Sequence, residues 1–145
     1  MRFDGYWQVG SDGVLSPVLI ADVRNRSGSY REVTFLVDTG ADATVLSYDV
    51  LVTLQHDYDT STDFHLEGVG GTSNSVLVTT QFLFKRDDGT KVPINGKFSA
   101  FTDPNALDLS VLGRDILNLF SVIVDRPGDV VCLLTGRHRY IIQET

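Results

Sequence analysis

An aspartate at the end of an apolar strand is the residue of this sequence best suited to chemistry. Asp38 follows the apolar run 33–37 and stands directly before Thr39 and Gly40. A glycine lets the backbone turn tightly, so that a carboxylate at a strand end can face a cleft and exchange protons there. The structural alternative is an Asx-turn, in which the side chain only caps the loop.

Size and composition narrow the class of protein. A chain of 145 residues is long enough to bury a core without disulfides or metals, so we expect one domain over residues 1–145 with its core at about 14–135. Hydrophobic residues at 42% and charged residues at 21% are typical of a folded protein. A net charge of −7 argues against a nucleic-acid partner, because such binding depends on Lys and Arg.

The number of cysteines and the hydropathy of the sequence bear on the cellular compartment of the protein. Cys132 is the single cysteine, so no intramolecular disulfide can form, and we expect a reducing, cytoplasmic setting. The first residues have no signal-like apolar core, and no stretch approaches the ~18 apolar residues that cross a bilayer. We therefore expect no membrane partner.

Short runs of strand-favouring residues, separated by Gly, Asp and Asn, predict an all-β protein. Ser47 is a suitable N-cap for a short helix over 48–54, and residues 114–119 suit one or two helical turns. We expect a polar connection at 56–63. The predicted strands are 1–10, 14–23, 30–37, 44–46, 76–84, 91–101, 108–113, 120–124, 130–134 and 140–143.

Two further motifs accompany Asp38. Residues 68–71 hold three glycines in four positions, which predicts a mobile hairpin tip. Val111-Leu112-Gly113-Arg114-Asp115 ends a short apolar strand with a glycine and an arginine. Each motif is weak alone, but the order of the three along the chain is specific.

Together with Asp38-Thr39-Gly40-Ala41-Asp42, these motifs resemble the retropepsin-like, or retroviral-type, aspartic proteases over about residues 17–134. Within that family the layout is most similar to the protease domain of the DNA-damage-inducible ubiquitin-shuttle proteins and to bacterial stand-alone relatives. The resemblance implies a closed acid-protease β-barrel with a flap hairpin and one or two short helices. It also implies a homodimer.

The resemblance further implies a mechanism. Two motif aspartates face each other and hold a water between them; because two close carboxylates cannot both ionise, one keeps its proton, as is known of aspartic proteases in general. This chain has one such triplet, so both aspartates must be Asp38, one from each subunit of a twofold dimer. The expected activity is hydrolysis of peptide bonds in extended protein segments, with no cofactor.

Neighbouring residues take supporting roles by the same resemblance. Thr39 would hydrogen-bond across the twofold axis, and Gly40 would offer its carbonyl to the substrate backbone. Ala41 stands where many pepsin-like enzymes carry a hydroxyl that favours the charged carboxylate, so we expect a working pH above the strongly acidic range. Asp42 and Arg114 would form an internal ion pair that braces the loop.

The flap tip would comprise Gly68, Val69, Gly70 and Gly71, whose backbone can bind an extended peptide as an added strand. Val69, Leu112 and Ile116 are candidates for apolar pocket walls. If the Asp42–Arg114 pair is buried, removing one partner should cost about 3 to 5 kcal/mol.

His56, His65 and His138 lack metal-site spacing and are predicted to be surface or structural residues, and no metal site is expected. Cys132 lies in an apolar strand and is predicted to pack rather than react. One alternative function stays open: a catalytically weak retropepsin-fold module that dimerises or binds peptides, because a fold does not guarantee activity.

Overall fold

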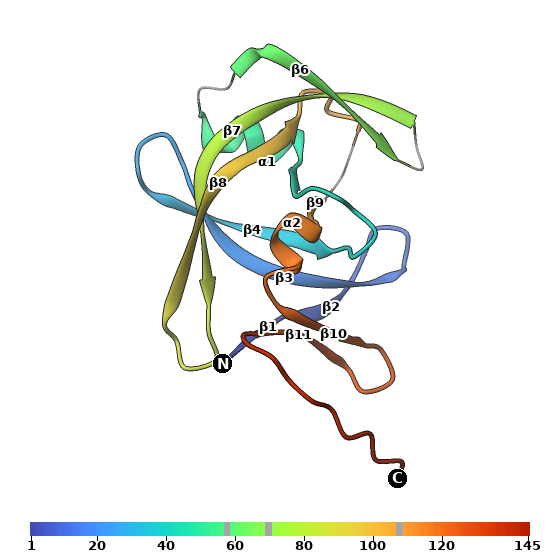
Figure 1. The fold of residues 1–145 in the computed structure, drawn as a ribbon. Helices are drawn as coiled ribbons and strands as arrows, with labels where there is room; N and C mark the ends of the chain where they lie inside the picture. The colour runs from blue at the N-terminus through green and yellow to red at the C-terminus, as the bar shows by residue number, and fades with distance from the viewer. Residues whose placement is uncertain (57–58, 69–70, 107–108) are drawn as a thin grey trace.

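The computed structural model describes residues 1–56, 59–68, 71–106 and 109–145. The described residues form two sheets and two short helices, which confirms the predicted all-β class (Figure 1). The larger sheet is 8-stranded, in the order β2-β3-β4-β9-β5-β8-β7-β6. Its strands are β2 (Tyr6–Val9), β3 (Leu15–Arg24), β4 (Tyr30–Val37), β5 (Val45–Leu46), β6 (Asp59–Gly68), β7 (Gly71–Lys85), β8 (Lys91–Phe101) and β9 (Ser110–Leu112).

The smaller sheet combines the two ends of the chain. It is 3-stranded and antiparallel, in the order β1-β11-β10. Its strands are β1 (Arg2–Asp4), β10 (Ser121–Asp125) and β11 (Val130–Leu134). The first predicted strand is therefore two strands, separated at Gly5, where an added Cβ would lie 2.2 Å from the Val18 carbonyl oxygen. That close approach lets the chain pass from one sheet to the other.

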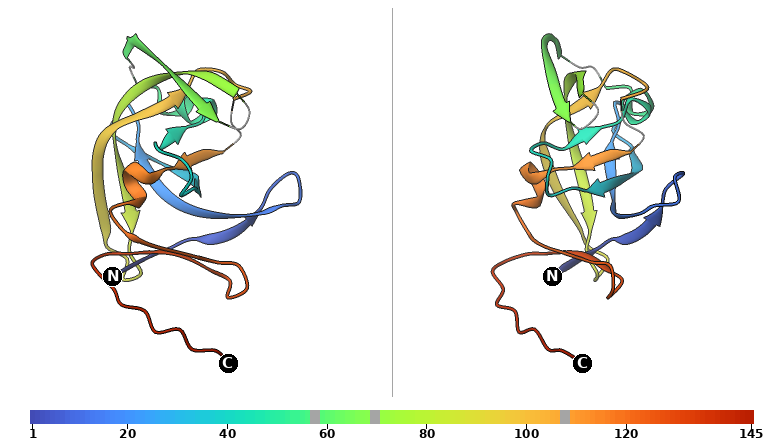
Figure 2. Two further views of the ribbon diagram at one scale, coloured as in Figure 1. Left: turned by 45° about the vertical axis from the view of Figure 1, so that its right-hand side comes forward. Right: turned by 90° about the vertical axis from the view of Figure 1, so that its right-hand side faces the viewer.

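The larger sheet curls on itself. β3 pairs with β4 along most of its length and also pairs with β7 through Asp22 and Val23, so strands far apart in the sheet order meet (Figure 2). Phe82 of β7 stacks on Phe98 of β8 with ring centroids 4.2 Å apart and contacts Phe35 of β4 at 5.2 Å. These buried rings form the centre of the core between the strands.

Phe3 connects the two sheets. Its ring is 1% exposed and lies edge-on to Phe84 at 6.2 Å and to Phe120 at 5.4 Å. On the other side of the junction Trp7 is partly buried, and the Arg126 guanidinium lies 5.5 Å from its ring centroid. The terminal sheet is thus packed against the rest of the fold.

The two helices are short and begin where expected. α1 (Tyr48–Leu54) has the predicted cap, because the Val50 N–H donates to Ser47 Oγ at 3.4 Å. α2 (Arg114–Leu117) starts after Gly113 and is two residues shorter than predicted. Leu51 and Leu54 of α1, and Ile116 and Leu117 of α2, face the core.

Two expectations about secondary structure are wrong. β6 begins at Asp59, so much of the expected polar connection at 56–63 belongs to a strand. Residues 140–143 form no strand, and the segment after β11 is extended and exposed (Figures 1 and 2). The part of the chain that the structure describes includes no helix of the length and hydropathy needed to cross a bilayer.

Candidate active site

Asp38 is placed by the end of β4. β4 pairs in parallel with β9, with Val37 opposite Leu112, and the Asp38 N–H donates to the Leu112 carbonyl at 3.1 Å. The chain then turns, and the Gly40 N–H donates to Asp38 Oδ1 at 2.9 Å. The half-buried carboxylate is therefore held in an Asx-turn. This turn fixes the orientation of the carboxylate and leaves it partly exposed. Asp38 can therefore cap the loop and still exchange protons in a cleft.

Arg114 lies against this loop from α2. Its guanidinium forms an ion pair with Asp42 and donates from Nη1 to the Thr39 carbonyl at 3.2 Å. The side chains are 44% exposed for Arg114 and 88% for Asp42, so the pair is a surface contact rather than the internal one expected. Because solvent screens such pairs, a cost of 3 to 5 kcal/mol for breaking it is wrong for this arrangement.

A second contact between the same two segments is centred on a buried threonine and is partly shielded from solvent. Thr44 is 0% exposed; its N–H and its hydroxyl both donate to Asp115 Oδ1, at 2.9 and 2.6 Å, and its Oγ1 accepts the Gly113 N–H at 3.0 Å. Backbone bonds run alongside, from the Arg114 N–H to the Ala41 carbonyl at 2.8 Å and from the Asp115 N–H to the Asp42 carbonyl at 3.3 Å. Thr44 and Asp115 thus tie the Asp38 loop to α2.

The sequence interpretation did not include Thr44 and Asp115 among the loop-supporting residues. The available signal was a threonine within the apolar run 43–46, because a buried hydroxyl needs a hydrogen-bond partner. Gly113 allows the contact: an added Cβ there would lie 2.4 Å from the Ala43 carbonyl carbon. The close crossing of the two loops explains why a glycine follows β9.

The flap candidate is the hairpin of β6 and β7. The backbones of Gly68 and Gly71 form its last register pair, and β7 continues as the partner of β8. Val69 and Gly70, the predicted centre of the tip, lie outside the described residues. The backbone arrangement is thus that of a hairpin whose arms end at the predicted glycines.

Two predicted pocket residues are not available to a ligand. Leu112 is 0% exposed and Ile116 is 2% exposed, and both belong to the core cluster. They pack the loops from behind. The expectation that they line the substrate pocket is therefore wrong for this chain.

His56 and His138, the two histidines whose side chains the structure describes, make contacts with the backbone. His56 Nε2 contacts the Arg24 carbonyl and lies 3.2 Å from Thr80 Oγ1, and His138 Nε2 lies 2.8 Å from the Thr135 carbonyl. The His65 side chain lies outside the described part. Within the described ranges no group of three or more His, Cys, Asp or Glu side chains is placed to hold a metal ion.

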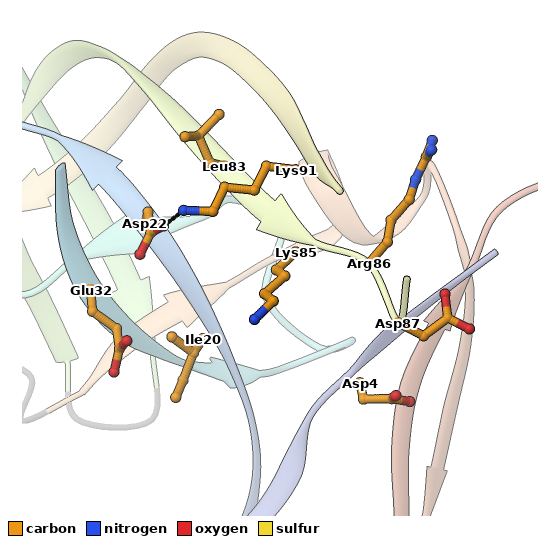
Figure 3. A pocket seen from close by; sticks show the side chains of 9 residues that line it. All are labelled: Asp4, Ile20, Asp22, Glu32, Leu83, Lys85, Arg86, Asp87 and Lys91. Atoms are coloured by element: carbon orange, nitrogen blue, oxygen red, sulfur yellow. Dashed lines mark hydrogen bonds and ion pairs between the residues drawn. The ribbon is translucent and has the colours of Figure 1, made fainter. Parts of the chain in front are cut away.

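A cavity of about 430 Å³ lies elsewhere, between β1, β3, β4 and β7 (Figure 3). It is lined by charges of both signs, and Lys91 Nζ forms an ion pair with Asp22 at 2.9 Å across one end. None of its lining residues belongs to the Asp38 loop or to α2. This cavity is therefore separate from the candidate active site.

The chain matches the family model described as retroviral aspartyl protease over residues 16–124. It is similar to the Gag-Pro polyprotein of squirrel monkey retrovirus, with 31% identity over 97 residues, which is 66% of this chain and 9% of the polyprotein. The Gag-Pro-Pol polyprotein of the same virus is also 31% identical over 97 residues, 66% of this chain and 5% of that protein. The chain thus spans a small part of the curated relatives it matches.

Two solved structures share the fold. The EIAV protease in complex with an inhibitor is 24% identical with a TM-score of 0.51, covering 71% of this chain and 86% of that one. A retropepsin-like aspartic protease from Rickettsia conorii is 19% identical with a TM-score of 0.55, covering 92% and 97%. The chain therefore belongs to the retroviral aspartyl protease family, the retropepsin-like aspartic endopeptidases, as the sequence predicted.

Proposed function

We propose that two copies of this chain form an aspartic endopeptidase that hydrolyses peptide bonds in extended protein segments. The observation that carries the proposal is the position of Asp38: a carboxylate held at the surface of a loop that its own backbone and α2 fix in place. Family membership supplies the reaction class. The closed barrel and the homodimer implied by the resemblance are part of this proposal.

The proposed chemistry needs two Asp38 carboxylates and one water. The ionised carboxylate takes a proton from the water, whose oxygen attacks the carbonyl carbon of the substrate, while the protonated carboxylate donates its proton to the carbonyl oxygen. Collapse of the tetrahedral species breaks the C–N bond, and the nitrogen leaves protonated. Thr39, exposed beside Asp38, is assigned the contact between subunits, and Gly40 the contact with the substrate backbone.

The Asx-turn makes Asp38→Asn a clean test. The asparagine Oδ1 can still accept the Gly40 N–H, so the loop should keep its shape while the carboxylate is lost. We expect cleavage of a diverse peptide library to fall at least about 100-fold in this variant. Asp12→Asn is the matched control, because Asp12 Oδ1 accepts the Val14 N–H at 2.9 Å in a comparable turn far along the chain.

The same assay distinguishes the protease from the alternative function, a module that dimerises or binds peptides without cleaving them. A wild-type protein that dimerises and binds library peptides but cleaves none is a binding module and not a protease. Cleavage that persists in Asp38→Asn contradicts the mechanism, and cleavage by a strictly monomeric protein contradicts the shared site.

A further inference from the structure

The cavity between β1, β3, β4 and β7 lies where the pairing of the larger sheet is interrupted (Figure 3). β4 pairs with β3 from Val18 to Arg24, so β2 and β7 both lie on the other edge of β3. On that edge the pairing with β2 ends at Val18, and β7 pairs only with Asp22 and Val23. No described strand therefore pairs with this edge of β3 at residues 19–21.

The backbone of Ile20 faces this interruption. In an antiparallel strand the N–H and C=O groups of alternate residues point to opposite edges. The Asn25 N–H donates to the Ser29 carbonyl, on the side of β4. The Arg24 carbonyl accepts the Thr80 hydroxyl at 2.8 Å, on the side of β7. Ile20 is an even number of positions from Arg24, so its N–H also points to the β7 side, into the cavity.

Four charged side chains lie around Ile20 on neighbouring strands. Asp22 lies opposite Glu32 of β4, and Lys85 of β7 lies opposite Lys91 of β8. Asp22 and Lys91 form an ion pair at 2.9 Å. Glu32 and Lys85 make no ion pair among the described residues. Each of these two charges is therefore left beside a like charge, an arrangement that destabilises a sheet.

The two unpaired groups lie on either side of one strand. Figure 3 shows Ile20 between the Lys85 ammonium and the Glu32 carboxylate. Ile20 and Leu83 are half-buried and give this part of the cavity an apolar floor. A ligand with a single charge would leave either Glu32 or Lys85 without a partner. A ligand with an ammonium group at one end and a carboxylate at the other neutralises both.

The remaining carboxylates of the cavity are already engaged. Asp4 forms an ion pair with Arg2 at 2.6 Å, and Asp87 Oδ1 accepts the Arg2 N–H at 3.4 Å. Figure 3 shows both carboxylates at the end of the cavity away from Glu32. The ammonium group of a ligand is therefore directed to Glu32.

We propose that this cavity binds a short zwitterionic peptide of two or three residues with an apolar side chain. Its carboxylate accepts hydrogen bonds from Lys85 Nζ and the Ile20 N–H, and its ammonium group pairs with Glu32. Neighbouring strands are about 4.8 Å apart, so β4 and β7, on either side of β3, are roughly 10 Å apart. An extended residue covers about 3.5 Å, which sets the length of the peptide. The proposal goes beyond the proposed function and does not depend on Asp38.

An NMR titration with end-blocked peptides tests the proposal. Isotope-labelled Asp38→Asn protein, which should leave the peptide intact, is titrated with alanyl-leucyl-alanine, with its N-acetylated form and with its C-terminal amide. We expect the free tripeptide to shift the backbone amide signals of Ile20 and Leu83. Each blocked form should bind about tenfold more weakly or worse, because each loses one charge-assisted contact.

Two variants assign the ends of the peptide. Lys85→Met should bind the free tripeptide about tenfold more weakly and should no longer distinguish it from the amide. Glu32→Gln should no longer distinguish it from the acetylated form. The matched controls are Lys97→Met and Glu144→Gln, which remove exposed charges of the same kind outside the cavity and should leave binding unchanged.

Three results overturn the proposal. Shifts at Gly40 without shifts at Ile20 place the peptide at the candidate active site instead. Equal binding of the free and blocked peptides shows that the charges take no part, and an absence of shifts at millimolar peptide shows that the cavity does not bind this class of ligand. The blocked peptides test the contacts without changing the cavity, so they decide the question even where a variant fails to fold. Cleavage of library peptides by wild-type protein is measured separately, so the proposed function stands or fails independently.

Discussion

At the scale of single residues, the buried Thr44 should support the Asp38 loop more strongly than the exposed ion pair between Arg114 and Asp42 does. Thr44, which is 0% exposed, gives two part-buried hydrogen bonds to Asp115 and accepts a buried one from the Gly113 N–H. The Arg114–Asp42 pair faces water, where such pairs contribute about 0 to 1 kcal/mol. The two contacts join the same segments but differ in what their loss leaves behind.

Thr44→Val keeps the shape of the side chain and removes the hydroxyl. The Gly113 N–H then loses its acceptor and Asp115 loses a donor, so the free energy of unfolding should fall by about 1 to 3 kcal/mol. Arg114→Ala should cost less than about 1 kcal/mol. Urea denaturation at equal protein concentration measures both. A larger fall in the free energy of unfolding for Arg114→Ala than for Thr44→Val would contradict this order and would support an internal Asp42–Arg114 ion pair.

Ala41 leads to a prediction about pH. Its N–H donates to the backbone carbonyl of Asp38 at 3.2 Å, so position 41 belongs to the same tight turn as the carboxylate. Ala41→Ser places a hydroxyl there, which can donate to the charged form and favour it. We expect the acidic limb of the pH–rate profile of Ala41→Ser to move to lower pH. Ala43→Ser, two residues farther along the loop, is the control, and an unchanged limb in Ala41→Ser contradicts the role given to this position.

At the scale of elements, the sequence predicted correctly those segments in which the apolar pattern, the capping residues and the turn residues favour the same structure. β4, α1, β8 and β11 have the predicted bounds, because alternating apolar residues, a serine cap and turn residues all point the same way. β6 was missed, since its polar sequence gains strand structure only by pairing with β7. Residues 140–143 show the converse: their apolar pattern favours a strand, yet no described strand pairs with them.

The candidate site divides in the same way. Asp38 and Gly40 were predictable because the motif itself makes the turn. Thr44 and Asp115 are 71 residues apart in sequence, and only the crossing of the two loops at Gly113 brings them together. Sequence spacing carries no information about such a crossing.

Cys132 is a buried thiol in the central strand of the terminal sheet. It is 4% exposed in β11, opposite Asp4 of β1 and Ile123 of β10. Burial raises the pKa of the Cys132 thiol, and the Asp4 carboxylate adds to the rise. The native state therefore holds the thiol proton more tightly than the unfolded chain does.

This shift predicts how stability changes with pH. The contribution of Cys132 is fully present below the ordinary thiol pKa of about 8.5 and is lost as the pH rises through the raised native value. The free energy of unfolding should thus fall more steeply above pH ~8.5 in wild-type protein than in Cys132→Ala. Urea denaturation from pH 7 to 10 measures the difference, and parallel curves for the two proteins would show that the thiol is not buried in solution.

At the scale of the whole molecule, the terminal sheet offers an open edge to the second copy of the proposed homodimer. β10 pairs with β11 on one side, and no described strand pairs with its other side. Its sequence, Ser121 to Asp125, includes three consecutive apolar residues, and Val124 is 42% exposed. An apolar edge with free backbone groups tends to pair with another strand. β10 also follows α2, so pairing here places it near the helix that braces the Asp38 loop.

We expect Val124→Asp to weaken the proposed dimer, because antiparallel pairing of β10 about a twofold axis would bring like charges on its two copies close together. The dimer dissociation constant should rise about tenfold or more, which corresponds to about 1.4 kcal/mol. Analytical ultracentrifugation measures it, and cleavage per molecule should fall at low protein concentration and recover at high concentration. Val9→Asp, on the exposed edge strand of the other sheet, is the control. If Val124→Asp and Val9→Asp proteins dimerise equally well and are equally active, the interface lies elsewhere. Activity is informative here because the proposed site needs an Asp38 loop from each copy, so cleavage depends on the strands that join the copies.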